Sequence, residues 1–165
     1  LLETYPDLIS IYDKRALAYF QLEQFDKAIE DWQAYLEQIG DDAEVNYRIG
    51  LACLKMDDYD QAQIYLSKAI ELDDSMGSAY YQRANLYSLQ KKYPEAAADY
   101  TKAIELGVGL DICYFNRGIA YLAQNNAEQA IADLQKVLEI SENEVLLTEA
   151  KKVLQLIEES KSSKK

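Results

Sequence analysis

A 34-residue spacing of alanines constrains this chain more than any other feature. The four alanines that share this spacing are Ala28, Ala62, Ala96 and Ala130. Each lies in a mostly apolar run in which bulky residues recur at helical spacing around the small one. A second series of small residues has the same period: Ala16, Gly50, Ala84 and Gly118. Because two helices approach closely only where side chains are small, the pattern predicts four antiparallel helix pairs.

The link inside each pair is also regular. An aromatic residue and then an acid or a proline open the second helix at Phe25-Asp26, Tyr59-Asp60 and Tyr93-Pro94, whereas the fourth link has Ala127-Glu128. An acid in the first turn complements the helix dipole, and proline is compatible with the first helical position. The predicted helices are 8–21, 25–38, 42–55, 59–72, 77–89, 93–106, 111–123 and 127–140.

This pattern resembles the tetratricopeptide repeat, whose period is 34 residues. The resemblance covers nearly the whole chain and implies an all-α, right-handed superhelical solenoid of antiparallel helix pairs. The expected repeats are 9–42, 43–76, 77–110 and 111–143. No repeat carries the family's closing proline; Gly40, Asp74, Val108 and Glu142 occupy that place.

The two ends of the chain predict further segments. Residues 1–8 are expected to be the tail of a preceding repeat, with Pro6 at its closing position, so the sequence is expected to be a piece of a longer array. Residues 144–159 form an amphipathic pattern that predicts a capping helix, with Ser141 and Glu144 spaced as a capping box. Residues 160–165 are expected to be disordered.

Arginine and aspartate vary together along the repeats. Arg15, Arg83 and Arg117 occur in the three repeats that carry Asp31, Asp99 and Asp133, while the second repeat has Ile49 and Tyr65 instead. The two positions lie at similar heights in an antiparallel hairpin. We therefore predict an ion pair within each of the three repeats, since the arginine fork suits a carboxylate; independent surface placement is the alternative.

Charge and composition exclude several classes of function. The chain carries 29 acidic against 17 basic residues, which disfavours nucleic acid and anionic membrane surfaces as partners. No apolar run is long enough for membrane insertion. The two cysteines, Cys53 and Cys113, are expected to be reduced packing residues, which favours a cytoplasmic location.

The sequence offers no catalytic constellation. It contains no histidine, no paired cysteines for zinc, no phosphate-binding glycine loop and no calcium loop. We therefore expect no enzymatic activity, no cofactor and no metal.

The resemblance implies that the first helices of the repeats line a concave groove. The groove is expected to bind a peptide or protein segment, which makes the protein an interaction scaffold. Two alternatives are open: a structural module that self-associates or stacks through the exposed flank of its N-terminal repeat, or the recognition arm of a larger enzyme. The expected groove residues are Asp13, Leu17, Tyr47, Leu51, Tyr81, Gln82, Asn85, Phe115, Asn116 and Ile119.

Chaperone-binding members of this family resemble one another in a carboxylate clamp of lysines, asparagines and an arginine. From the first repeat, the corresponding residues here are Asp13, Leu17, Arg48, Ser78 and Gln82. From the second repeat they are Tyr47, Leu51, Gln82, Ile112 and Asn116. Neither set matches, so a C-terminal carboxylate ligand of that type is not expected.

Overall fold

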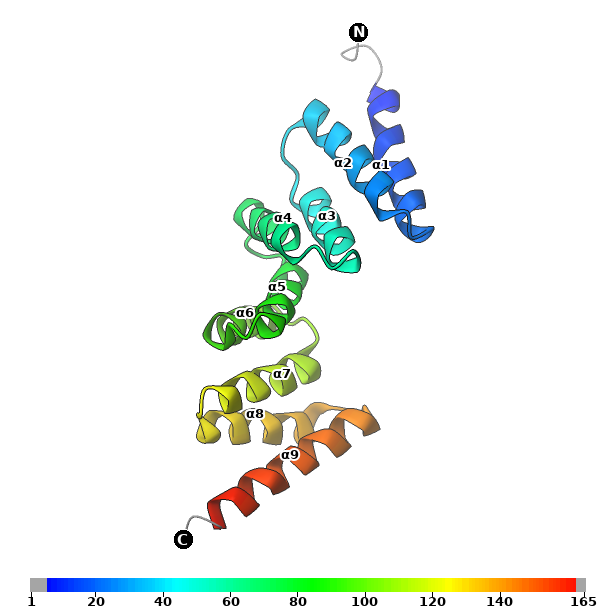
Figure 1. The fold of residues 1–165 in the computed structure, drawn as a ribbon. Coiled ribbons are helices and arrows are strands. Elements are labelled where there is room, and N and C mark those ends of the chain that lie inside the picture. The colour runs from blue at the N-terminus through cyan, green and yellow to red at the C-terminus, as the bar shows by residue number, and fades with distance from the viewer. Residues whose placement is uncertain (1–5, 163–165) are drawn as a thin grey trace. The chain divides into compact units, whose positions relative to one another are not determined.

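The computed structural model describes residues 6–162, and all of the regular structure among them is α-helical (Figure 1). The helices are α1 (Pro6–Gln21), α2 (Phe25–Ile39), α3 (Ala43–Lys55), α4 (Tyr59–Leu72), α5 (Gly77–Leu89), α6 (Tyr93–Glu105), α7 (Leu110–Ala123), α8 (Ala127–Ile140) and α9 (Glu144–Ser162). The chain divides into an N-terminal unit, Leu1–Ala79, and a C-terminal unit, Tyr80–Lys165. None of the described helices has the length and apolarity needed to cross a bilayer.

The first eight helices agree closely with the predicted ones, and the differences lie at the two ends. Residues 6–8, expected to belong to a preceding repeat, form the start of α1, since proline is compatible with a first helical position. Residues 160–162, expected to be disordered, continue α9. The expectations for residues 1–5 and 163–165 lie outside the described residues.

The predicted capping box of α9 is wrong. Asn143 precedes the helix, and its Oδ1 accepts hydrogen bonds from the backbone N–H groups of Val145 and Leu146 at 3.0 and 3.2 Å. Ser141 donates instead to Asp111 Oδ2 at 2.7 Å, which ties the segment before α9 to α7. Asparagine and serine cap equally well, and Ser141 is engaged elsewhere.

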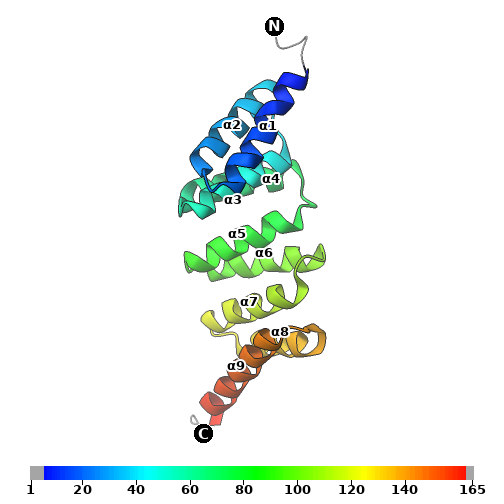
Figure 2. The same cartoon turned by 90° about the vertical axis from the view of Figure 1, so that its right-hand side faces the viewer.

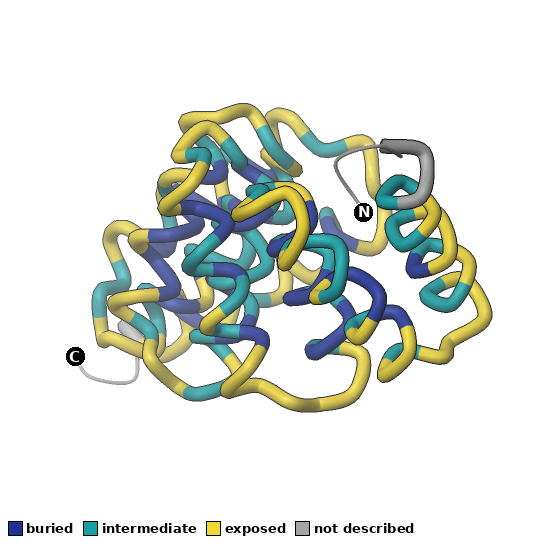
Figure 3. Tube along the Cα trace, turned by 90° about the horizontal axis from the view of Figure 1, so that it is seen from above, coloured by how far each residue is buried: buried dark blue, intermediate teal, exposed yellow. Residues whose placement is uncertain are grey.

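The two helices of a pair pack side by side, as α1 and α2 do in Figure 2. The alanines at both crossing positions are fully buried. A Cβ added at Gly50 would lie 2.9 Å from Leu66 Cγ, so the contact of α3 with α4 has no room for alanine. Buried stretches lie among exposed ones along the chain, as the dark blue and yellow parts of the tube in Figure 3 show. The core is therefore a series of narrow seams between neighbouring helices.

Two residues after the end of each first helix, a residue that is not glycine adopts the left-handed conformation. The four residues are 34 apart, Glu23, Asp57, Lys91 and Asn125, with φ between 57 and 60°. At Lys91 the N–H donates to Ser88 O, and the N–H of Lys92 donates to Tyr87 O at 2.8 Å. The same two bonds recur at the other three corners, so every hairpin turns through a Schellman motif.

The three predicted ion pairs are confirmed. Each arginine donates from two guanidinium nitrogens to the two carboxylate oxygens of its aspartate, with distances between 2.6 and 2.9 Å. All three aspartates are buried on the second helix of their hairpin. The hydrogen bond with Asp133 raises the pKa of Arg117, so the guanidinium group keeps its proton.

Tyrosines lie against these guanidinium groups. Arg117 lies 5.3 Å from the ring centre of Tyr114 and 5.8 Å from that of Tyr121, one helical turn before and after it. Arg83 has the same arrangement with Tyr80 and Tyr87. The ring faces shield the ion pair and add cation–π attraction.

The second repeat replaces the ion pair with apolar and aromatic groups. Ile49 is fully buried in the place of arginine. Tyr65, in the place of aspartate, accepts a hydrogen bond from Gln33 Nε2 of α2 at 2.9 Å. An apolar pair can therefore occupy the same site.

Replacing Lys91 by glycine is expected to stabilise the protein. A left-handed conformation costs an L-residue about 1–2 kcal/mol, and glycine avoids this cost. Glycine also has more conformational freedom in the unfolded chain, which reduces the net gain in stability. We expect a net gain of about 0.5–1 kcal/mol for Lys91→Gly and a smaller gain for Asn125→Gly, because asparagine tolerates this conformation. Urea unfolding followed by circular dichroism measures both. Equal gains, or a loss for Lys91→Gly, would contradict this account.

Removing one partner of a buried ion pair is expected to destabilise the C-terminal unit strongly. Asp133→Ala leaves Arg117, whose side chain is only 15% exposed, without its counterion, at a cost of about 3 kcal/mol. Asp31→Ala should cost much less, because the Arg15 side chain is 51% exposed and can be hydrated.

The matched control is the double variant Arg117→Ile/Asp133→Tyr, which copies the second repeat and should recover most of the loss. Alkylation of Cys113 in rising urea reports the opening of the C-terminal unit. A double variant no more stable than Asp133→Ala would show that the site does not accept an apolar pair.

Candidate functional site

The predicted groove residues of the N-terminal unit lie on α1 and α3. Asp13 is already engaged, since its Oδ1 accepts from Trp32 Nε1 at 3.0 Å and from Arg48 Nη1 at 2.9 Å. It thereby joins α1, α2 and α3. Leu17, Tyr47 and Leu51 are half-buried. The structure brings none of these four into a described pocket.

The C-terminal unit brings three of the predicted residues together. Asn85 of α5 and Asn116 and Ile119 of α7 line a pocket of about 450 Å³. The remaining lining residues are Ser88, Leu89, Tyr93, Tyr100 and Ala120.

The other three predicted residues of this unit do not line the pocket. Tyr81 packs against the buried cluster that contains Tyr100, and the two ring centres are 6.3 Å apart. Phe115 packs against the buried cluster between α7, α8 and α9. Gln82 is half-buried on α5.

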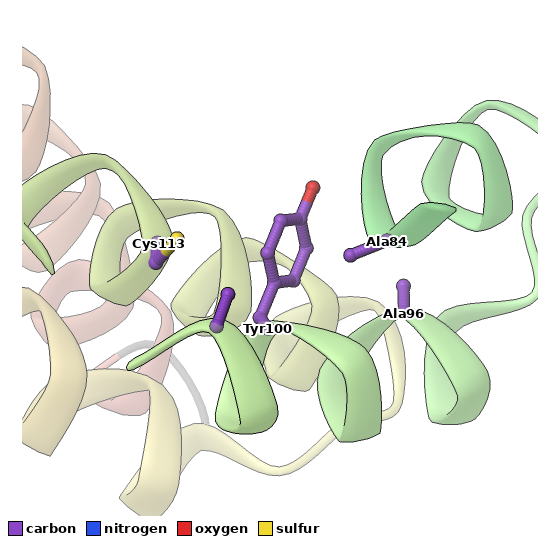
Figure 4. Close-up of a cluster of buried hydrophobic side chains, with 5 residues drawn as sticks. Ala84, Ala96, Tyr100 and Cys113 are labelled. Atoms are coloured by element: carbon purple, nitrogen blue, oxygen red, sulfur yellow. The ribbon is translucent and has the colours of Figure 1, made fainter. Parts of the chain in front are cut away.

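Tyr100 connects the pocket to the core. It is 1% exposed, and its ring projects from α6 toward α5, beside the facing alanines Ala84 and Ala96 (Figure 4). Burial raises the pKa of its phenol to about 12, so the hydroxyl is protonated and can donate. It donates to Asn85 Oδ1 at 2.7 Å, and Ser88 Oγ lies 3.4 Å from the same hydroxyl.

The two asparagines form one polar pair. Asn116 Nδ2 lies 3.4 Å from Asn85 Oδ1, the atom that also accepts from Tyr100. Among the described residues, Asn85 Nδ2 and Asn116 Oδ1 have no recorded hydrogen-bond partner. The pair therefore offers one amide donor and one amide acceptor to the pocket, held in place from below by a buried tyrosine.

The rest of the lining is apolar and uncharged. Leu89 and Ile119 are 65% and 36% exposed, and Tyr93 is half-buried beside them. No lysine, arginine or acid is among the lining residues. Within residues 6–162, no group of three or more cysteines and acids is placed to hold a metal ion. The chemistry available in this pocket is hydrogen bonding and apolar contact.

Sequence reasoning missed Tyr93 and Tyr100 as parts of this site. The prediction drew only on the first helices, whereas both tyrosines come from α6. The 34-residue pattern shows an aromatic residue at the hairpin turn, which is Tyr93 in the third repeat. A residue at this position is as consistent with a role in closing the turn as with a role in binding.

Family models described as tetratricopeptide repeat match residues 14–57, 43–75, 77–106 and 112–144. Together they span most of the chain. A comparison with curated protein sequences finds no significant match.

Solved structures with a similar fold cover most of the chain. The crystal structure of MamA protein has a TM-score of 0.74 at 25% identity, over 84% of this chain and 75% of that one. YrrB, described as a TPR protein with an unusual peptide-binding site, has a TM-score of 0.76 at 23% identity, over 87% and 74%. The first TPR of Spaghetti (RPAP3), bound to the HSP90 peptide SRMEEVD, has a TM-score of 0.63 at 28% identity, over 70% and 92%.

The stability of the C-terminal unit is expected to fall at alkaline pH because of Cys113. The thiol is buried against Tyr100 and Ala103, and burial raises its pKa to about 11, above the value of about 8.5 of an exposed thiol. The unfolded state loses this proton first. The contribution to stability is therefore present below pH ~8.5 and disappears as the pH rises toward 11.

Between pH 7.5 and 10 we expect the wild type to lose about 1–2 kcal/mol more than Cys113→Ala, which lacks the thiol. Urea unfolding of both proteins at the two pH values measures the difference. Parallel losses would show that the thiol titrates normally in the folded protein.

Proposed function

Because the chain belongs to the tetratricopeptide repeat family, we propose that it is a non-enzymatic scaffold that binds a peptide or protein segment. The observation that carries the proposal is the asparagine pair in the pocket of the C-terminal unit. The first helices supply the pair, as expected of a groove on that side of the repeats.

The asparagine pair matches the hydrogen-bonding pattern of an extended peptide. A backbone offers one carbonyl acceptor and one N–H donor per residue. Asn85 Nδ2 can donate to the carbonyl, and Asn116 Oδ1 can accept from the N–H. Tyr100 holds Asn85 by the bond to its Oδ1, so little side-chain entropy is lost when a ligand binds.

The apolar lining selects the side chain of the bound segment. Leu89, Ile119 and Tyr93 surround a space large enough for an aliphatic or aromatic side chain. Without a cation, the pocket has nothing to balance a carboxylate. We therefore expect an internal segment with an apolar side chain. An acidic peptide, such as the SRMEEVD peptide bound to Spaghetti (RPAP3), fits the chemistry of this pocket poorly.

The other predicted groove residues extend the same proposal. Leu17, Tyr47 and Leu51 would serve as a separate apolar contact surface of the N-terminal unit, beside the ion pair of Asp13 with Arg48. The two free cysteines are consistent with a cytoplasmic setting.

The role of the pocket in peptide binding can be tested at Asn116, which is half-buried, and Ile119, which is exposed, because truncating either side chain leaves the core intact. A random peptide library is selected on the wild type, and the affinity of the best peptide is measured by calorimetry. We expect Asn116→Ala and Ile119→Ala each to weaken binding about tenfold, which corresponds to roughly 1.4 kcal/mol. Leu156→Ala, a change on the exposed side of α9, is the matched control and should bind as the wild type does.

Two outcomes would count against the proposal. Unchanged affinity in folded Asn116→Ala and Ile119→Ala would place the peptide elsewhere. Selection of peptides that bind only through a free C-terminal carboxylate would contradict the chemistry of the lining.

A further inference from the structure

One position near the end of each first helix carries a large apolar residue in three repeats and a serine in the other. Counted in steps of 34, the four residues are Phe20, Leu54, Ser88 and Leu122. Ser88 lines the pocket of the C-terminal unit that the proposed function uses. The side chains at this position in the other repeats show what fills the corresponding space there.

In the first repeat, the ring of Phe20 packs against two aromatic rings of α2. Its centre lies 5.3 Å from that of Phe25, in an edge-to-face arrangement, and 5.9 Å from that of Trp32. Aromatic pairs prefer separations and tilts of this kind. The Phe20 side chain therefore fills the space between the end of α1 and the facing side of α2.

The fourth repeat fills the same space with an aliphatic group. Leu122 and Ala127 both pack against the buried cluster that contains Leu134. These three residues occupy the places of the aromatic trio in the first repeat. In both repeats, a large side chain of the first helix reaches the second helix.

The third repeat has only a serine at this place. Ser88, Tyr93 and Tyr100 occupy the positions of the trio, and all three line the pocket of about 450 Å³. The serine side chain stops at its hydroxyl, whose oxygen lies 3.4 Å from that of Tyr100. The pocket is therefore the space that Phe20 fills in the first repeat. We call its part between these three residues the aromatic seat.

The surroundings of the aromatic seat suit an incoming ring. Tyr100 forms its floor and is 1% exposed, as Trp32 is in the first repeat. Tyr93, in the place of Phe25, is half-buried and forms one side. Leu89 and Ile119 line the same pocket and are exposed, so the approach from solvent is apolar.

We propose that the aromatic seat takes the phenyl ring of a phenylalanine in the bound segment, placed against Tyr93 as Phe20 is placed against Phe25. This inference rests on the proposed function and narrows the apolar anchor of the ligand to one kind of side chain. Edge-to-face contact with Tyr93 favours an aromatic ring over an aliphatic group. Asn85 and Asn116 line the same pocket, so the backbone and the ring of one residue are held together.

The probe is N-acetylphenylalanine methylamide, which carries a phenyl ring between two amide groups, together with its leucine and alanine counterparts. Nuclear magnetic resonance of the isotope-labelled protein follows the side-chain amides of Asn85 and Asn116. We expect saturable shifts with the phenylalanine compound. The affinity should be about threefold lower for the leucine compound and roughly tenfold or more lower for the alanine compound.

Two variants fill the aromatic seat from within the chain. Ser88→Phe copies the first repeat, and Ser88→Leu, a smaller change, copies the second and fourth repeats. We expect both to abolish binding of the phenylalanine compound and to raise the urea midpoint, because an internal side chain fills the space. Ser160→Phe adds the same group at an exposed position of α9 and should bind as the wild type does.

Three results would overturn the inference. The first is the absence of saturable shifts with the phenylalanine compound. The second is binding of the leucine compound that is as tight as that of the phenylalanine compound. The third is binding that folded Ser88→Phe or folded Ser88→Leu retains.

The outcome is distinguishable from the fate of the proposed function. If library peptides bind through Asn116 with no preference for phenylalanine at the anchor, the aromatic seat is refuted and the proposed function stands. If the phenylalanine compound binds and Ser88→Phe blocks it, while no peptide binds through the pocket, the aromatic seat stands and the proposed function fails.

Discussion

The forked bond between an arginine on one helix and an aspartate on the next sets the geometry of these hairpins. Two parallel hydrogen bonds fix the distance between the helices, their relative height and their rotation. Arg83–Asp99 and Arg117–Asp133 are largely buried, with tyrosine rings over the guanidinium group. Because the buried arginine and aspartate cannot be hydrated in another arrangement, only one alignment of the two helices keeps them paired. The small residues nearby allow the two backbones to approach closely around the ion pair.

The position of the ion pair also links the repeats of the C-terminal unit. Arg117 bonds Asp133 within its own hairpin and Thr101 of the hairpin before. Tyr100, the neighbour of Thr101, reaches back to Asn85 and holds the polar pair of the pocket. Two adjacent residues of α6 therefore have different roles: Thr101 contributes to the contact between repeats, and Tyr100 supports the proposed binding site. The order of the pocket thus depends on the packing of α6 against α7.

The helix pairs and their ion pairs could be predicted because the chain contains four versions of the same helical hairpin. Arginine and aspartate vary together across the repeats, and the exception, Ile49 with Tyr65, loses both at once. The left-handed corners escaped prediction for the opposite reason. Glu23, Asp57, Lys91 and Asn125 have no side-chain property in common, and backbone hydrogen bonds impose their conformation. At α9, Ser141 and Asn143 were both plausible caps, and only the contact of Ser141 with Asp111 decides between them.

The corner residues have a consequence for how such a chain can change over evolutionary time. A turn closed by backbone bonds tolerates many side chains, so its sequence can drift between duplicated copies without opening the hairpin. Its length has no such freedom, because one inserted residue would rotate the following helix by about 100° and turn its apolar face outward. This constraint explains why the repeats differ in sequence but keep a constant length of 34 residues.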